Sequence, residues 1–185
     1  MDTSDPEIGF DEEGVCHHWH EFQDRVDKEL YNGEEGCRRA QAMASDIKRE
    51  TKGKRYDCLI GLSGGVDSSY VAWVVVKQLG LRPLAVHMDN GWNSELAVSN
   101  IERIVKKLDI DLHTEVLDWE EFRELQKAFF RASVGNVEMA TDHAINATLF
   151  AQARKEGIRH ILSGSNLNSE GIVQHGGWAH DNKDW

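Results

Sequence analysis

The stretch Leu59-Ile60-Gly61-Leu62-Ser63-Gly64-Gly65-Val66-Asp67-Ser68-Ser69 decides the fold. The apolar run before it, residues 56–62, predicts a buried strand, and the Val- and Ala-rich run after it, residues 70–79, predicts a helix. A strand, a glycine turn and a helix in this order form a layout in which proteins hold phosphate. Glycines let the backbone approach an anion, and the first free N–H groups of the helix point at it.

The glycine turn differs from the two commonest phosphate loops. No Gly-Lys-Ser/Thr follows it, as a Walker A loop requires, and its spacing is not G-x-G-x-x-G. Ser-Gly-Gly-Val-Asp-Ser-Ser resembles the S-G-G-x-D-S signature of the PP-loop ATP pyrophosphatases. In that family the loop holds the β and γ phosphates of ATP, and attack on the α phosphate releases AMP and pyrophosphate. The resemblance therefore implies ATP and Mg²⁺ as cofactors.

The residue types of this loop suit such chemistry. Glycines expose backbone amides, serines add hydroxyl donors, and Asp67 can hold the Mg²⁺ that neutralises a leaving pyrophosphate. The plainer alternative is a Ser/Gly turn in which Asp67 caps an ordinary helix. The flanking strand and helix favour the phosphate site. Asp67 is then also a catalytic and metal-binding residue, and the predicted nucleotide-binding residues of the loop are Ser63, Gly64, Gly65, Asp67, Ser68 and Ser69.

Composition sets the class of protein. The chain has 185 residues, of which 40% are hydrophobic, enough for a globular domain with a core. A net charge of -11 argues against a surface that binds nucleic acid. No apolar run approaches the roughly 20 residues of a membrane span, and no signal peptide is visible. Three widely spaced cysteines, Cys16, Cys37 and Cys58, favour a reducing compartment. We therefore expect a cytoplasmic protein that engages neither nucleic acid nor membrane.

The order of elements predicts an α/β fold. Residues 1–54 read as an irregular and helical N-terminal segment, with helices at about 19–31 and 37–51, separated by Gly33 and Gly36. Residues 55–185 alternate strands and helices. Repeated units of this length predict a doubly wound, mostly parallel sheet with helices on both faces. The predicted strands are 56–62, 82–88, 112–116 and 159–162, and the helices are about 68–79, 94–108, 119–131 and 139–156.

In such sheets ligands bind beyond the carboxyl ends of the strands, so the other strand ends are candidate sites. The second predicted strand ends at Val86, His87 and Met88, where PP-loop enzymes receive adenine on the backbone. A polar strand end without a role is the alternative.

The fourth predicted strand is followed by small polar residues that include Gly164 and Asn166, with Glu170 close behind. Glu170 could complete a magnesium shell that Asp67 begins. The segment resembles G-T-x-N-x-S-E of NAD synthetase, and the alternative is a plain loop of turn-forming residues.

Two further clusters have competing interpretations. Asp142 and His143 could hold a substrate hydroxyl or steer ammonia as catalytic residues, or Thr141 or Asp142 could cap the helix while His143 is buried. Residues 16–20, Cys-His-His-Trp-His, carry zinc-type ligands. Because neighbouring residues do not share one face of a helix, a solvated helix start is the favoured interpretation.

The motifs together resemble the N-acetyl sugar amidotransferases of surface-polysaccharide synthesis, such as those for lipopolysaccharide O-antigen or capsule. The resemblance covers nearly the whole chain. It rests on Met-Asp-Thr-Ser-Asp-Pro at residues 1–6, Phe-Asp-Glu-Glu-Gly-Val-Cys at 10–16, the Ser63–Ser69 loop, Asp-Asn-Gly-Trp at 89–92, Ala-Thr-Asp-His-Ala at 140–144, and Gly164, Ser165, Asn166, Glu170 and Gly171.

The resemblance implies that an N-acetyl group on a nucleotide-linked sugar becomes an acetamidino group in an AMP- and pyrophosphate-forming reaction. It implies two partners, a glutaminase subunit that releases ammonia and a cyclase-like subunit. No nucleophilic cysteine is needed, and Cys58, inside the first strand, is expected in the core.

The chain departs from this family in two ways. Family members carry a C-x-x-C pair before Met-Asp-Thr and a second Cys where Trp19 stands, so three of four ligands are missing, which argues against a structural zinc. They also extend well beyond Trp185, so the resemblance implies a fragment whose α/β domain is C-terminally incomplete. The alternatives are an ammonia-dependent NAD synthetase-like enzyme, a tRNA-thiolating PP-loop enzyme, or a truncated ATP-binding module without turnover.

Overall fold

A computed structural model describes residue 5 and residues 7–167 of the chain, which divides into two compact units. One unit is Ala40–Gly164, and the other contains the described residues on either side of it. The sheet lies wholly in the first unit. No helix in the described ranges is long and apolar enough to cross a membrane.

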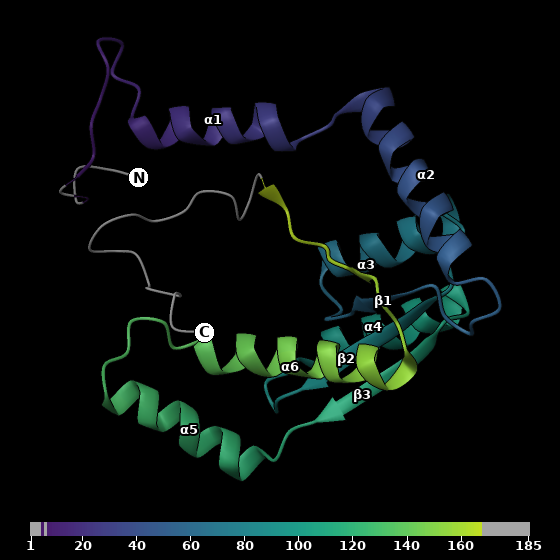
Figure 1. Ribbon diagram of the computed structural model, residues 1–185. Helices are drawn as coiled ribbons and strands as arrows, with labels where there is room; N and C mark the ends of the chain where they lie inside the picture. Colours follow the sequence, from purple (N-terminus) through teal and green to yellow (C-terminus); the bar gives the residue numbers. More distant parts are fainter. Residues whose placement is uncertain (1–4, 6, 168–185) are drawn as a thin grey trace. The chain divides into compact units, whose positions relative to one another are not determined.

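The sheet has four parallel strands in the order β3-β2-β1-β4 (Figure 1). The chain places β1 first and then winds to β2 and β3 on one side, before β4 joins the other side of β1. This is the doubly wound parallel arrangement that the sequence predicts, and the winding reverses between β1 and β4. The strands are β1 (Cys58–Gly61), β2 (Pro83–Asp89), β3 (Asp111–Val116) and β4 (Ile161–Leu162).

Helices cover both faces of the sheet. Side chains alternate along β1, so Cys58 and Ile60 join one core while Leu59 joins the other. The first core includes Ile47 from α2, Ala72 from α3 (Val66–Trp73) and Ile101 from α4 (Glu95–Leu108). The second core includes Ala153 of α6 (Met139–Glu156), which Figure 1 shows alongside the sheet. The prediction that Cys58 lies in the core is confirmed, and burial raises the pKa of its thiol to about 12.

Helix ends follow the local signals in the sequence. Ser94 Oγ accepts a hydrogen bond from the Ala97 amide at 3.1 Å at the start of α4. Asp118 Oδ1 does the same for Glu121 at 3.0 Å and opens α5 (Trp119–Arg131). Helix α6 ends at Gly157, whose φ of 66° is left-handed. The predicted helices 119–131 and 139–156 therefore match at both ends.

Other boundaries differ from the prediction. The first and fourth strands are shorter than expected, four and two residues long. Helix α3 passes into a π-helical turn, η1 (Val74–Gln78), where the Leu79 amide donates to the Val74 carbonyl at 2.9 Å. Three consecutive valines begin this turn, and β-branched side chains crowd the turn before them. Gly80, whose φ of 61° is left-handed, follows the end of this turn.

The N-terminal helices begin earlier than predicted, as α1 (His17–Glu29) and α2 (Gly33–Glu50). Gly33 is the first residue of α2, and Gly36 lies inside this helix and does not separate two helices as predicted. A Cβ at Gly36 would collide with the Tyr31 carbonyl oxygen, so glycine is needed there for a close backbone approach.

Candidate functional site

The glycine loop lies where the winding of the sheet reverses. It leaves the carboxyl end of β1 and leads into α3, while β4 ends on the other side of β1. A Cβ placed on Gly164, just after β4, would be 3.2 Å from the backbone carbonyl of Asp67 and 3.3 Å from Val71 Cγ2. The loops after β1 and β4 are therefore in contact, at the position where open α/β sheets bind ligands.

Gly64 is fixed in a conformation that only glycine tolerates. Its φ is +78°, it is buried, and a Cβ there would collide with the Ala97 carbonyl oxygen. Asn100 Nδ2 donates to the Gly64 carbonyl at 3.1 Å, so α4 holds the loop from behind. Gly65 is less constrained, because its φ is -75° and its nearest neighbour is the Ser63 hydroxyl at 3.3 Å.

The serine hydroxyls hydrogen-bond within the loop. Ser68 Oγ accepts from the Ser63 amide at 3.2 Å, lies 3.1 Å from Ser63 Oγ and donates to the Gly65 carbonyl at 3.2 Å. Ser69 Oγ also donates to the Gly65 carbonyl, and the Gly65 amide donates to Ser63 Oγ at 3.3 Å. In this state the serines hold the shape of the loop, and a bound anion would compete for the same hydroxyls.

The backbone amides and one carboxylate remain available. Val66, Asp67 and Ser68 form the first turn of α3, where amides have no carbonyl four residues earlier in the helix. None of these three amides donates to another described residue. The exposed Asp67 carboxylate likewise makes no hydrogen bond or ion pair within the described ranges. The loop thus combines anion donors with one oxygen-rich cation ligand.

A hydrogen-bonded cluster follows β2. His87 is 8% exposed, and its Nδ1 lies 2.9 Å from the Leu62 carbonyl, which can only accept. Its Nε2 faces Asn93 Nδ2 at 3.1 Å, and the same amide donates to Asp89 Oδ1 at 2.9 Å. The partners therefore assign the Nδ1–H tautomer. His87 joins the end of β1, one residue before the glycine loop, to the turn after β2.

The three residues predicted near adenine are placed differently from one another. The side chains of Val86 and His87 are buried, whereas Met88 is partly exposed. The Val86 carbonyl accepts from the Leu62 amide at 2.8 Å as part of the sheet. What these residues offer to a ligand at the strand end is therefore mainly the remaining backbone and Met88.

Asp142 and His143 lie exposed in the first turn of α6. The helix begins at Met139, so neither Thr141 nor Asp142 is at the capping position that one interpretation gave them. Leu149, two turns later, packs against Gly61 at the end of β1, with 3.7 Å to a Cβ built there. The Asp142 side chain makes no hydrogen bond to any described residue.

The remaining predicted residues lie elsewhere in the chain. Asn166 belongs to the unit that does not contain the glycine loop. Glu170, the second predicted metal ligand, lies outside the described residues.

The histidines of residues 16–20 form bonds within their own unit. His17, His18 and Glu21 place potential metal-binding atoms within 4.8 Å of one another, and the two rings are 3.9 Å apart. Neighbouring histidines therefore do come together, contrary to the geometric expectation. However, His17 Nδ1 accepts from the Gly9 amide at 3.0 Å, which uses the lone pair of the neutral ring. His18 Nε2 lies 2.7 Å from Asp5 Oδ2.

The residues that hold the loop in place carry little local signal in the sequence. Asn93, Ala97 and Asn100 all lie after β2, more than 20 residues beyond the loop in the chain. Asparagine inside a helix is unfavourable and is a weak signal for a tertiary hydrogen bond, which is the role of Asn100.

A family model and one protein of known sequence match this chain. A protein-family model described as NAD synthase matches residues 40–170, more than half of the chain. An uncharacterised protein from Methanocaldococcus jannaschii is 28% identical over 81 residues, which are 44% of this chain and 28% of that protein.

Solved structures share the fold. The NH3-dependent NAD synthetase from Campylobacter jejuni aligns with a TM-score of 0.53 at 18% identity, over 76% of this chain and 61% of that one. The glutamine-dependent NAD+ synthetase from Acinetobacter baumannii, in complex with ADP, aligns with a TM-score of 0.54 at 18% identity, over 72% of this chain and 26% of that one. The chain therefore spans less than two thirds of the length of these proteins.

Proposed function

The chain belongs to the NAD synthase family, a branch of the PP-loop ATP pyrophosphatases, and from this premise we propose that it is an ATP-dependent ligase acting on an amide. The proposed reaction converts the N-acetyl group of a nucleotide-linked sugar to an acetamidino group. The observation that carries the ATP part is the loop at the point of sheet reversal, where three amides and the Asp67 carboxylate have no partner among the described residues.

The loop residues have distinct tasks in this proposal. The amides of Val66, Asp67 and Ser68 receive the β and γ phosphates. Asp67 holds Mg²⁺, which when bound offsets the negative charge of the leaving pyrophosphate. Gly64 allows α4 to press against the loop, so the amides are oriented before the nucleotide arrives.

The chemistry proceeds in two balanced steps. The acetamido oxygen attacks the α phosphorus, the bond to the β phosphate breaks, pyrophosphate leaves and the amide nitrogen loses its proton. Ammonia then adds to the activated carbon, AMP leaves with the former carbonyl oxygen, and an amidine remains. Adenylation replaces a poor leaving group by a good one, so no cysteine nucleophile is required. Asp142 and His143 would steer ammonia or accept its proton.

The ammonia source and the sugar rest on sequence motifs. The combination of Phe-Asp-Glu-Glu-Gly-Val-Cys with Ala-Thr-Asp-His-Ala supports the sugar amidotransferases. Those enzymes draw ammonia from a glutaminase subunit that works with a cyclase-like subunit, and we propose the same partners here. The proposed process is surface-polysaccharide synthesis in the cytoplasm.

A second candidate has direct support from the comparisons. The matched family and two aligned structures are NAD synthetases, which favours an ammonia-dependent reaction on deamido-NAD. Both candidates use the glycine loop in the same way and differ in the substrate that supplies the attacking oxygen.

Release of AMP separates the candidates. The chain is incubated with ATP, Mg²⁺ and ammonium, together with a UDP-N-acetyl sugar or with deamido-NAD, and AMP is quantified by chromatography. AMP with the sugar and none with deamido-NAD supports the first candidate, and the reverse overturns it. ATP binding by calorimetry without AMP from either substrate would indicate a binding module without turnover.

A further inference from the structure

A groove lies between the edge strand β3 and helix α6. None of the residues that line it belongs to the glycine loop. The volume of the groove is about 310 Å³. His113 and Glu115 alternate on one face of β3 and line it, opposite a stripe of α6 that includes Ala147, Ala151 and Gln152. Among the lining residues of α6, Ala144, Ala147 and Ala151 are separated by three and four residues, so they share one face, and Gln152 lies next to Ala151 at its edge.

Gln152 is the unusual member of this groove. It is 8% exposed, lies beside the core residue Ala153, and its carboxamide makes no hydrogen bond to any described residue. The carboxamide nitrogen and oxygen themselves reach the groove, since they are not among the fully buried polar atoms that lack a partner in the described ranges. An amide that opens onto a cavity in this way is positioned for a ligand that supplies both an acceptor and a donor.

The shape of the groove favours a small flat ring. Ala147 and Ala151 carry only methyl groups and are exposed, so a planar ring can lie close to the helix backbone. Ligand pockets range from roughly 300 to 1,000 Å³, and a volume of about 310 Å³ lies at the lower end of that range. One ring with an attached sugar suits this space better than a dinucleotide.

The charges in the groove favour an uncharged part of the ligand. His113 Nε2 lies 3.1 Å from Glu115 Oε2, and the Glu115 side chain is 51% exposed. A carboxylate at the rim accepts hydroxyl groups but repels phosphate. A nucleotide in this groove would therefore place its base inside and its ribose hydroxyls near Glu115, with the phosphates outside.

We propose that this groove binds the pyrimidine base of the nucleotide-linked substrate, with Gln152 pairing to the ring. A carboxamide matches the adjacent N–H and carbonyl of uracil, donating to the oxygen and accepting from the nitrogen. This inference rests on the proposed function for the identity of the ligand, whereas the groove and Gln152 are independent of it.

The test is a titration of the 185-residue chain, labelled with ¹⁵N, with uridine in the absence of ATP. Uridine is expected to shift the side-chain amide signal of Gln152 in the NMR spectrum, and adenosine is expected to shift it much less. Gln152→Leu keeps the size of the side chain and removes the amide. It should weaken uridine binding by about tenfold or more, while the melting temperature stays close to that of the wild type, because leucine fills a similar space and no hydrogen bond to a described residue is lost.

Two further variants make the result decisive. Asn146→Leu makes the same kind of change on an exposed position of α6 outside the groove and should bind uridine normally. Ala147→Leu fills the groove from an exposed position and should abolish uridine binding without unfolding the chain. Equal binding by wild type and Gln152→Leu, no binding by wild type, or an equal response to adenosine would each overturn the proposal.

The outcome is separable from the proposed reaction. Uridine binding that depends on Gln152, without AMP formation from any nucleotide-linked sugar, supports the groove and contradicts the reaction. AMP formation from the sugar nucleotide with an unchanged KM in Gln152→Leu supports the reaction and overturns the groove.

Discussion

Strand β1 has an aspartate before it and another shortly after it, and the two are used in opposite ways. The Asp57 side chain is 3% exposed and accepts hydrogen bonds from the Arg82 amide at 2.8 Å, the Arg82 guanidinium at 2.7 and 3.0 Å, and Thr51 Oγ1 at 2.6 Å. Asp67 is exposed and has no partner within the described part of the chain. The fold satisfies the first carboxylate, whereas the second has no partner among the described residues.

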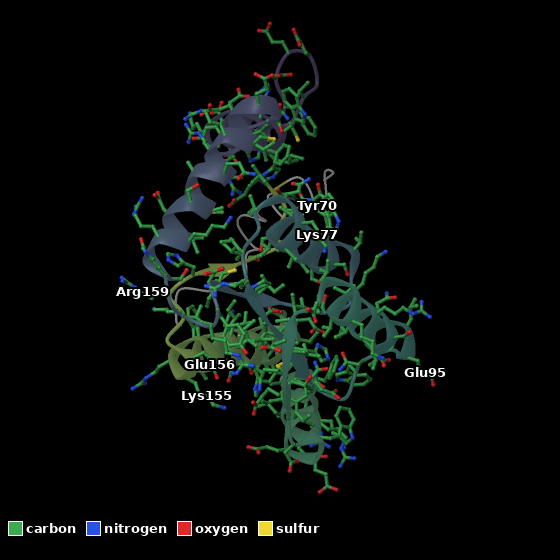
Figure 2. All side chains as sticks on the ribbon, turned by 90° about the vertical axis from the view of Figure 1, so that its right-hand side faces the viewer. Tyr70, Lys77, Glu95, Lys155, Glu156 and Arg159 are labelled. Carbon is green, nitrogen blue, oxygen red and sulfur yellow. The ribbon has the colours of Figure 1, made fainter. Side chains whose placement is uncertain are left out.

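The same contrast extends across the sheet. At the amino end, Tyr56 OH donates to Asp111 Oδ2 at 2.7 Å and Arg55 pairs with the same oxygen at 2.9 Å. Figure 2 shows the charged side chains of Lys155, Glu156 and Arg159 around the C-terminal end of α6. At the carboxyl end, the amides of Val66, Asp67 and Ser68 donate to no residue in the part of the chain that the structure describes. Polar groups at one edge stabilise the fold, and those at the other are available for chemistry.

The largest expected effect is on Asp67. Asp67→Asn keeps the shape of the side chain but removes the charge that we propose holds Mg²⁺, so the proposed AMP formation should fall by about a thousandfold or more. The free energy of unfolding should change by less than about 0.5 kcal/mol, because the side chain is exposed and bonds to no described residue. Rates of AMP release and urea denaturation measure the two effects.

A matched control for Asp67→Asn is Glu95→Gln, which removes an exposed charge at the start of α4, labelled in Figure 2. It should retain wild-type activity. An active Asp67→Asn enzyme would show that the unpaired carboxylate has no catalytic use, and the contrast with Asp57 would lose its meaning.

The next largest effect separates two adjacent glycines. Gly64→Ala imposes a left-handed conformation on alanine, at about 1–2 kcal/mol, and forces α4 away from the loop, at about 1–3 kcal/mol more. Gly65→Ala needs only a small movement of the Ser63 hydroxyl and should lose less than about 1 kcal/mol. Thermal denaturation compares them, and calorimetry with ATP should show weaker binding for Gly64→Ala. Similar stability of both variants would contradict the description of the loop.

These contacts show what local sequence can predict. Asp118 and Gly157 are local signals, and both helices that they bound were predicted at both ends. The glycine loop was recognisable because its spacing is itself the motif. The hold of Asn100 on Gly64 and of Asn93 on His87 depends on where α4 packs, which no local pattern encodes.

The predicted lengths of the first and fourth strands were wrong for a related reason. How far β1 extends toward its amino end depends on the neighbouring strand: the Asp57 amide still donates to the Arg82 carbonyl at 2.8 Å, but the paired register begins only at Cys58. Gln152 escaped notice because a glutamine in a helix is ordinarily exposed, and only the packed structure shows that it is buried.

A smaller effect is expected at Asp57. Asp57→Ala leaves the Arg82 amide without its acceptor, whereas the Thr51 hydroxyl can still donate to the Ile47 carbonyl at 2.8 Å, so the free energy of unfolding should fall by about 2 kcal/mol. The Arg82 side chain is 55% exposed and can return to water, so the lost ion pair adds little. Activity per folded molecule should be retained, the reverse of the result at Asp67. Urea denaturation and AMP release together test this reversal.

Acid should reveal the same interaction. Burial alone would raise the pKa of Asp57, but hydrogen bonds from Arg82 and Thr51 outweigh it and hold the pKa below its usual value. The carboxylate therefore stabilises the fold above about pH 4, and this stabilisation is lost as the pH falls through the lower folded pKa. Asp57→Asn should lose less stability than wild type between pH 5 and pH 2, which urea denaturation of both proteins at each pH measures. If the urea midpoints of the two proteins fell equally with pH, this account would be contradicted.

The smallest effect is expected at Tyr56, where the ring is partly buried and the hydroxyl is bonded to a carboxylate. Burial first, and then the hydrogen bond to Asp111, raise the pKa of Tyr56 to about 12. An unfolded tyrosine ionises near pH 10, so the folded protein keeps a proton that the unfolded chain releases. Stability from this group is complete below about pH 10 and is lost as the pH rises toward 12. Tyr56→Phe should lower the free energy of unfolding by about 1 kcal/mol at pH 8 and flatten its decline above pH 10, as measured by denaturation at both pH values. If the free energy of unfolding declined equally steeply in the variant, groups other than Tyr56 would be responsible for the loss of stability above pH 10.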